Sequence, residues 1–166
     1  MKFEKLTKEQ YVWVGVRLVL AWTLLWAFLD KTFGLGYATK SSNAWINGGS
    51  PTTGYLAYAT SGPLADLWNG LSGNSVVDAL FMLALLAVGA AVLLGIGQKI
   101  AGIAGAALML MLWSTNLPPD NNPLTDDHIV YALLFIGFIF VRPGNWYGLG
   151  KWWSQTSIVK KFPFLE

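Results

Sequence analysis

The stretch YVWVGVRLVLAWTLLWAFLDK, residues 11–31, decides the fold of this chain. Residues 11–29 are nearly all apolar. A helix that rises about 1.5 Å per residue would extend roughly 28 Å over this stretch, which is close to the thickness of the hydrocarbon layer of a bilayer. We therefore predict that residues 11–30 form a membrane-spanning helix.

Charged residues interrupt this apolar stretch at two places. Arg17 lies about a third of the way along it, and Asp30 and Lys31 close its far end. A charge inside a span is costly, so each needs a partner or a route to the lipid headgroups. Arg17 and Asp30 are about 20 Å apart along a helix, too far to pair. Arg17 is expected to snorkel to the interface, to bind a lipid or quinone headgroup, or to find partners on neighbouring helices.

The composition supports a membrane protein with a single domain, residues 1–166. The chain is 54% hydrophobic and 12% charged, whereas soluble domains are about 25% charged. A net charge of +2 is too small to indicate nucleic-acid binding. The N-terminal residues MKFEKLTKEQ lead into the first span without a small-residue cleavage site, which favours a retained anchor over a signal peptide.

The residue inventory excludes several kinds of redox centre. The chain has no cysteine, which excludes disulfides, thiolate catalysis and iron–sulfur ligation by its own thiols. It has a single histidine, His128, which excludes a bis-histidine haem within one chain. We expect no covalently bound cofactor, and any electron transfer would use a bound organic cofactor, a quinone or a partner subunit.

Four apolar stretches predict an all-α membrane protein, a four-transmembrane-helix bundle in which each span satisfies its own backbone hydrogen bonds. They lie at about residues 11–30, 76–97, 100–117 and 126–142. The last is the shortest, and we expect its helix either to begin earlier, near Leu124, or to lie in a thinned region of the bilayer.

Basic residues predict the orientation of the spans. They gather before the first span, between the second and third, and after the fourth: Lys2, Lys5, Lys8, Lys99, Arg142, Lys151, Lys160 and Lys161. By the positive-inside rule both termini are cytoplasmic (N-in/C-in), in a multi-pass protein of the plasma membrane.

The first loop and the C-terminal residues flank the bundle. Residues 32–75 are rich in aromatic residues, and we predict an outer cap with short interfacial helices that open near Pro51 and near Gly62–Pro63. Residues 143–166 combine tryptophans with Lys160 and Lys161, which favours an interfacial tail on the cytoplasmic side. Docking of a cytoplasmic partner is the alternative for this tail.

Polar residues recur at one depth near the outer ends of the four spans: Asp30, Lys31, Asp78, Asn116 and His128. Asp78 and His128 are the candidates for proton transfer, and the whole group, together with Trp45 of the loop, is a candidate binding site for a small anion or a quinone carbonyl. The alternative is that these groups are hydrated and cap helices, as we expect of Asp126. His128, Asp30 and Asp78 are chemically acceptable metal ligands, but their spacing is not that of a known metal motif, so we predict no metal site.

Five segments carry a family resemblance. They are Arg17 in the first span, FLDKTFGLG (28–36), AWINGGSPTTGYL (44–56), VVDALFM (76–82) and PPDNNPLTDDHIVYAL (118–133). In these segments the chain resembles the DoxX/DoxD family, which includes the small membrane subunits of thiosulfate:quinone oxidoreductases. The resemblance covers most of the chain and implies a four-helix membrane bundle, but it assigns no catalytic residue.

Two hypotheses about function follow. The first is a redox-associated membrane subunit, at most part of a quinone-dependent oxidoreductase, whose outer polar group binds a quinone or an anion such as thiosulfate. The second is a non-enzymatic membrane scaffold or assembly factor that binds lipid or a small solute. Small residues recur every four positions at Ala87, Ala91 and Gly95, which suits close packing within the bundle or between copies in a homo-oligomer.

Overall fold

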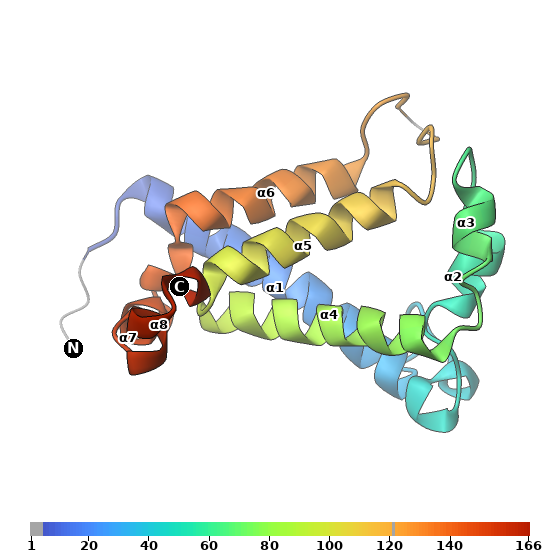
Figure 1. Ribbon diagram of the computed structural model, residues 1–166, viewed down its shortest axis with the longest axis horizontal. Helices are drawn as coiled ribbons and strands as arrows, with labels where there is room; N and C mark the ends of the chain where they lie inside the picture. The colour runs from blue at the N-terminus through green and yellow to red at the C-terminus, as the bar shows by residue number, and fades with distance from the viewer. Residues whose placement is uncertain (1–4, 121) are drawn as a thin grey trace.

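Four long antiparallel helices run along the long axis of the molecule (Figure 1). The computed structural model describes residues 5–120 and 122–166, so the expected N-terminal Lys2 lies outside the described residues. The long helices are α1 (Lys8–Phe33), α4 (Ser75–Leu94), α5 (Gln98–Trp113) and α6 (Asp127–Val141). Within the described part of the chain the secondary structure is helical, apart from one isolated β-bridge between Ser61 and Asn116.

Two of these helices, α1 and α4, are long and apolar enough to cross a membrane. Helices α5 and α6 are also apolar but have only 16 and 15 residues, which gives lengths of about 24 Å and 22 Å. The expectation that the last helix begins near Leu124 is wrong. The side chain of Asp126 accepts a hydrogen bond from the backbone N–H of His128, and this N-cap starts α6 at Asp127.

The helices pack as two pairs, α1 with α4 and α5 with α6, joined mainly where α4 meets α5. Glycines allow the close approach within each pair. A Cβ atom on Gly89 of α4 would lie 2.9 Å from the side chain of Leu25, and one on Gly105 of α5 would lie 2.5 Å from the ring of Phe135. The core between the pairs is built from aliphatic side chains with two fully buried rings, Phe135 and Phe138.

A cap segment, residues 34–74, crosses one end of the bundle, which we call the cap end (Figure 1). It contains four short helices: η1 (Ser41–Asn43), η2 (Trp45–Asn47), α2 (Thr53–Tyr58) and α3 (Ala65–Asn69). Hydrogen bonds tie it to the loop that follows α5. The Ser61 hydroxyl donates to the side-chain oxygen of Asn116 over 2.9 Å, and the Trp68 indole donates to the carbonyl of Ser114 over 3.2 Å.

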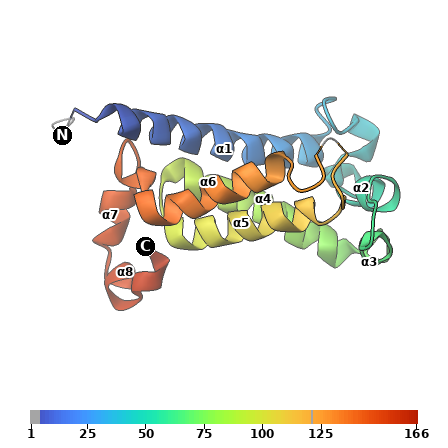
Figure 2. The ribbon, with the colours of Figure 1, turned by 90° about the horizontal axis from the view of Figure 1, so that it is seen from above.

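A tail segment, residues 142–166, folds at the opposite end, which we call the tail end (Figure 2). It contains η3 (Pro143–Asn145), α7 (Gly150–Ser154), α8 (Ser157–Lys161) and η4 (Pro163–Leu165). The backbone N–H of Leu149 donates to the carbonyl of Leu94, the last residue of α4, over 2.8 Å. The tail segment is thereby fixed to the bundle through the backbone.

Candidate functional site

Arg17 lies at the tail end and is a structural residue. Its side chain has no exposed area. Nη1 donates to the carbonyls of Val92 (3.3 Å) and Leu93 (3.0 Å), and Nη2 donates to the carbonyl of Tyr147 (2.9 Å). The first two carbonyls belong to the last turn of α4, where the helix dipole is negative and favours a cation. Snorkelling or binding of a lipid or quinone headgroup would need an exposed guanidinium, so Arg17 takes the third option, partners on neighbouring elements.

Glycines make room for this guanidinium. Gly95, which ends α4, has a φ of 74°, a conformation that side chains disfavour. A Cβ atom on Gly95 would lie 2.7 Å from Nη1 of Arg17 and 2.6 Å from the Cα of Gly144. The chain therefore passes close to Arg17 on both the α4 side and the tail side.

Asp30, at the cap end of α1, holds the loop that follows its own helix. It is only 2% exposed. Its two carboxylate oxygens accept from the backbone N–H groups of Ala38 (2.9 Å) and Tyr37 (3.3 Å). These bonds fold the chain back after α1. The carboxylate of Asp30, which was predicted to bind a ligand, is therefore occupied by the backbone.

Asp78, in the first turn of α4, anchors the cap segment. One carboxylate oxygen accepts from the hydroxyls of Ser50 (2.9 Å) and Thr52 (2.5 Å) and from the backbone N–H of Thr52 (3.2 Å). Its side chain lies on the same buried face of α4 as Met82 and Leu85, as the helical spacing predicts. Asp78 thus contacts the candidate site through Thr52 rather than directly.

A cavity of about 190 Å³ lies at the cap end where all four long helices meet the cap segment. It is lined by Lys31 of α1, Pro51, Thr52 and Tyr55 of the cap segment, Phe81 of α4, Leu112 of α5 and His128 of α6. The cavity brings together Lys31 and His128, which are 97 positions apart in the chain (128 − 31). Lys31 and His128 are the two predicted site residues that line it, and we call it the Lys31–His128 cavity.

Lys31 brings a positive charge to this cavity, and the nearest opposite charge is the carboxylate of Asp30. Its ammonium makes no hydrogen bond or ion pair with any residue in the ranges 5–120 and 122–166. The neighbouring Asp30 carboxylate is directed to backbone N–H groups instead. A second, larger hollow of about 590 Å³ also has Lys31, Pro51 and Tyr55 in its lining, together with polar residues of the cap segment. The ammonium thus lies between two spaces that a ligand can enter.

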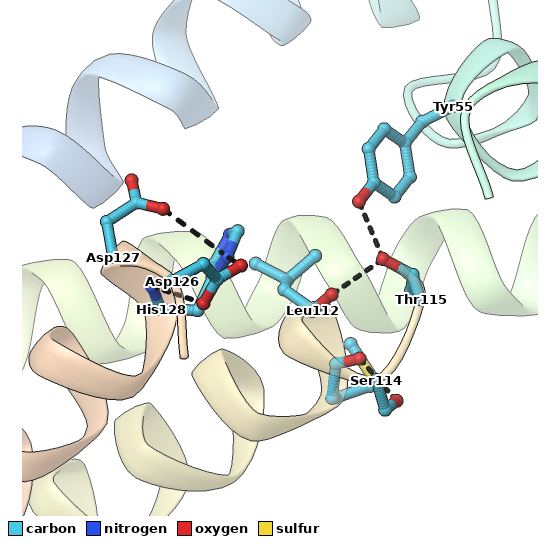
Figure 3. A network of polar contacts seen from close by, with 8 residues as sticks. Tyr55, Leu112, Ser114, Thr115, Asp126, Asp127 and His128 are labelled. Atoms are coloured by element: carbon cyan, nitrogen blue, oxygen red, sulfur yellow. Dashed lines mark hydrogen bonds and ion pairs between the residues drawn. The ribbon is translucent and has the colours of Figure 1, made fainter. Parts of the chain in front are cut away.

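His128 is oriented by the residue that caps its helix. One oxygen of Asp126 accepts from the backbone N–H of His128 at 3.0 Å, and the other lies 2.8 Å from Nδ1 of the ring (Figure 3). A carboxylate that accepts from Nδ1–H fixes the tautomer in which Nε2 carries a lone pair. The imidazole in the cavity is therefore placed to accept a proton through Nε2. The sequence predicted the cap but not this second contact.

Tyr55 is a residue of the site that the sequence analysis did not select. Figure 3 shows its ring pointing from the cap segment toward Thr115, and its hydroxyl lies 2.6 Å from the Thr115 hydroxyl. Thr115 itself donates to the carbonyl of Leu112 over 2.6 Å, so Tyr55 is the donor in their bond. In the sequence Tyr55 is one of several aromatic residues in a loop, with nothing to separate it from interfacial residues.

Two predicted ligands lie outside this cavity. Asn116 is bonded to Ser61 and lines a different hollow of about 350 Å³, with acidic and polar residues of the α5–α6 loop. Trp45 belongs to η2, is 37% exposed and is not in the cavity lining. Both residues contribute to the cap end without reaching Lys31 or His128.

A set of potential metal ligands occurs at the start of α6. One ligand atom each from Asp126, Asp127 and His128 lies within 4.8 Å of the other two. The combination considered from the sequence, His128 with Asp30 and Asp78, is not formed, because both carboxylates bind the cap segment and its loop. We attribute the Asp126 contacts to capping and to orientation of the imidazole.

Comparisons with known proteins add no assignment. No protein family model matches the chain, and no curated protein or solved structure matches it. Arguments about function therefore depend on the cavity and on the sequence segments quoted above.

Proposed function

We propose that the chain is a DoxX-like integral membrane protein of the plasma membrane, in which all four long helices cross the bilayer and both termini are cytoplasmic. Large apolar side chains are exposed on each long helix, for example Val19, Leu80, Ile103 and Leu133. Such side chains suit contact with lipid. The lysines and arginines that flank the helices gather mainly at the tail end, which supports its placement on the cytoplasmic side.

We further propose that the Lys31–His128 cavity binds a quinone headgroup and that the protein is a redox-associated subunit. The observation that carries this proposal is that an unpaired ammonium and an oriented imidazole line one cavity. A quinone is a flat apolar ring with two opposed oxygens. Lys31 donates a hydrogen bond to one oxygen, and Phe81 and Leu112 supply apolar contacts for the ring.

His128 accepts or donates the proton at the other oxygen of the quinone. A quinol held there would donate one hydroxyl proton to Nε2, and Asp126 would stabilise the imidazolium that forms, while the second proton would pass to solvent. In the reverse direction the imidazolium would return one proton and solvent would supply the other. The two electrons would pass to or from a partner redox subunit.

Binding of a short-chain ubiquinone analogue to purified protein in detergent tests this proposal. We expect Lys31→Met and His128→Ala each to weaken binding at least about tenfold, since each removes one of the two polar contacts. Lys40→Met, which removes an exposed lysine at the same end of the bundle but outside the cavity lining, is the matched control and should bind normally. Unchanged affinity in both cavity variants would refute quinone binding.

The second candidate is a non-enzymatic scaffold or assembly factor that binds lipid or a small solute. It is favoured because Asp30 and Asp78 serve as structural anchors. The cavity therefore has fewer ionisable groups than the sequence analysis predicted. Mass spectrometry and absorption of molecules that copurify with the protein separate the candidates. A quinone or flavin supports the redox subunit, and phospholipid alone supports the scaffold.

A further inference from the structure

The tail segment is a folded platform rather than a loose extension. The indole of Trp153 donates to the carbonyl of Leu165 over 2.7 Å, which closes α7 onto η4. The Glu166 side chain lies 2.9 Å from Arg142 and 3.2 Å from Lys99, so it connects the end of α6 to the start of α5. These contacts hold the platform in a fixed position at the tail end of the bundle.

The exposed side chains of this platform are mainly apolar or basic, with neutral Gln155 and Ser157 among them. Trp152, Ile158 and Phe164 are between 51% and 62% exposed, and Lys160 and Lys161 are also exposed. Residues 143–165 contain no aspartate or glutamate, and Glu166 is engaged by its two cations. Aromatic rings beside uncompensated lysines are the combination that favours the interface of an anionic membrane.

An apolar groove adjoins the platform. It has a volume of about 300 Å³ and runs between α4 and α5, where small side chains such as Ala87, Ala91 and Ala104 leave space. Trp153 and Leu165 of the platform complete its lining at the tail end. Helix α8, which carries the two lysines, contacts η4, which carries Leu165. The lysines therefore lie on an element next to the one that completes the groove.

We infer that the groove and the two lysines form a binding site for an anionic phospholipid, with an acyl chain in the groove and the phosphate near Lys160 and Lys161. A second copy of the chain is a poorer occupant, because two platforms of the same positive charge would repel each other. The inference rests on the proposed membrane placement of the helices but not on quinone binding, because the site is at the other end of the bundle.

Thermal stabilisation of the purified protein by dioctanoyl phosphatidylglycerol, compared with the phosphatidylcholine analogue, tests the headgroup. We expect the anionic lipid to stabilise the wild type and to bind at least about tenfold more weakly to the double variant K160Q/K161Q. The control K40Q removes a single lysine charge at the cap end and should respond like the wild type. Equal effects of the two lipids, or unchanged binding by K160Q/K161Q, would overturn the inference.

The variant Ala87→Leu tests the groove. Ala87 is exposed, so the larger side chain fills the groove without entering the core. We expect it to weaken phosphatidylglycerol binding about fivefold or more while leaving the weak binding of glycerol phosphate unchanged. If glycerol phosphate stabilises the protein as well as the lipid does, the site takes a phosphate alone and the acyl-chain part is wrong. Quinone-analogue binding should be the same in all of these variants.

Discussion

Two cations of helix α1, Arg17 and Lys31, are placed in opposite ways. Arg17 at the tail end is completely buried and donates to three backbone carbonyls, whereas Lys31 at the cap end faces a cavity without a protein partner. Carbonyl groups at the end of α4 compensate the guanidinium, so its charge stabilises the fold. The ammonium makes no hydrogen bond or ion pair with a described residue, and only the charge of the neighbouring Asp30 acts on it. The comparison supports a stabilising role for the first cation, and it agrees with our proposal that the second binds a ligand.

The largest expected effect is a loss of stability on substitution of Arg17, which distinguishes its role from that of Lys31. Arg17→Leu removes the donor to three carbonyls in a buried place and should lower the free energy of unfolding by about 3–5 kcal/mol. Lys31→Met should change it by less than about 0.5 kcal/mol, because the ammonium makes no hydrogen bond or ion pair with a described residue. Chemical unfolding in detergent measures both. Similar losses in the two variants would show that the ends do not differ in this way.

Asp78 provides a second, smaller test, at the cap end alone. Asp78→Asn weakens the charge-assisted bonds to Ser50 and Thr52 and should cost about 1.5–3 kcal/mol, with most of the loosening in the cap segment. Limited proteolysis and hydrogen exchange should therefore report faster opening of residues 34–74 than of the bundle. Asp66→Asn changes an exposed acid on α3 and is the control. Equal opening of cap and bundle would show that Asp78 does not specifically anchor the cap.

Substitution of Asp126 should have the smallest effect on stability. It also tests whether a residue can affect ligand binding more than it affects stability. Asp126→Ala removes an N-cap and should cost about 1 kcal/mol, yet it should also weaken binding of a quinone analogue because the imidazole loses its orienting carboxylate. Asp127→Ala, whose side chain is 69% exposed and 3.8 Å from the ring, should bind almost normally. Calorimetric titration of both variants measures the difference. An identical loss in the two would mean that orientation of the ring is unimportant.

Local patterns in the sequence predict the local features of the structure. Apolar runs locate the four long helices, the residue type at position 126 predicts a cap, and helical spacing places Asp78 on the same face as Met82. The convergence of Lys31 and His128 was also expected from their shared depth. These features follow from residues that are close in sequence or repeat at a helical period.

The roles of Arg17 and Asp30 could not be predicted from the sequence, because their partners are backbone groups. Arg17 binds carbonyls 75, 76 and 130 positions away, and every residue offers a carbonyl, so residue type gives no sign of this pairing. Asp30 likewise binds backbone N–H groups of a loop. For such groups only the path of the folded chain decides whether a charge is used by the protein or remains for a ligand.

The arrangement in two helix pairs has a mechanical consequence. The lining of the Lys31–His128 cavity comes from both pairs, α1 with α4 and α5 with α6, and the cap segment bridges them through the bond between Tyr55 and Thr115. A small change in the angle between the pairs therefore widens or narrows this space. A ligand in this cavity would therefore contact both helix pairs and the segment that bridges them.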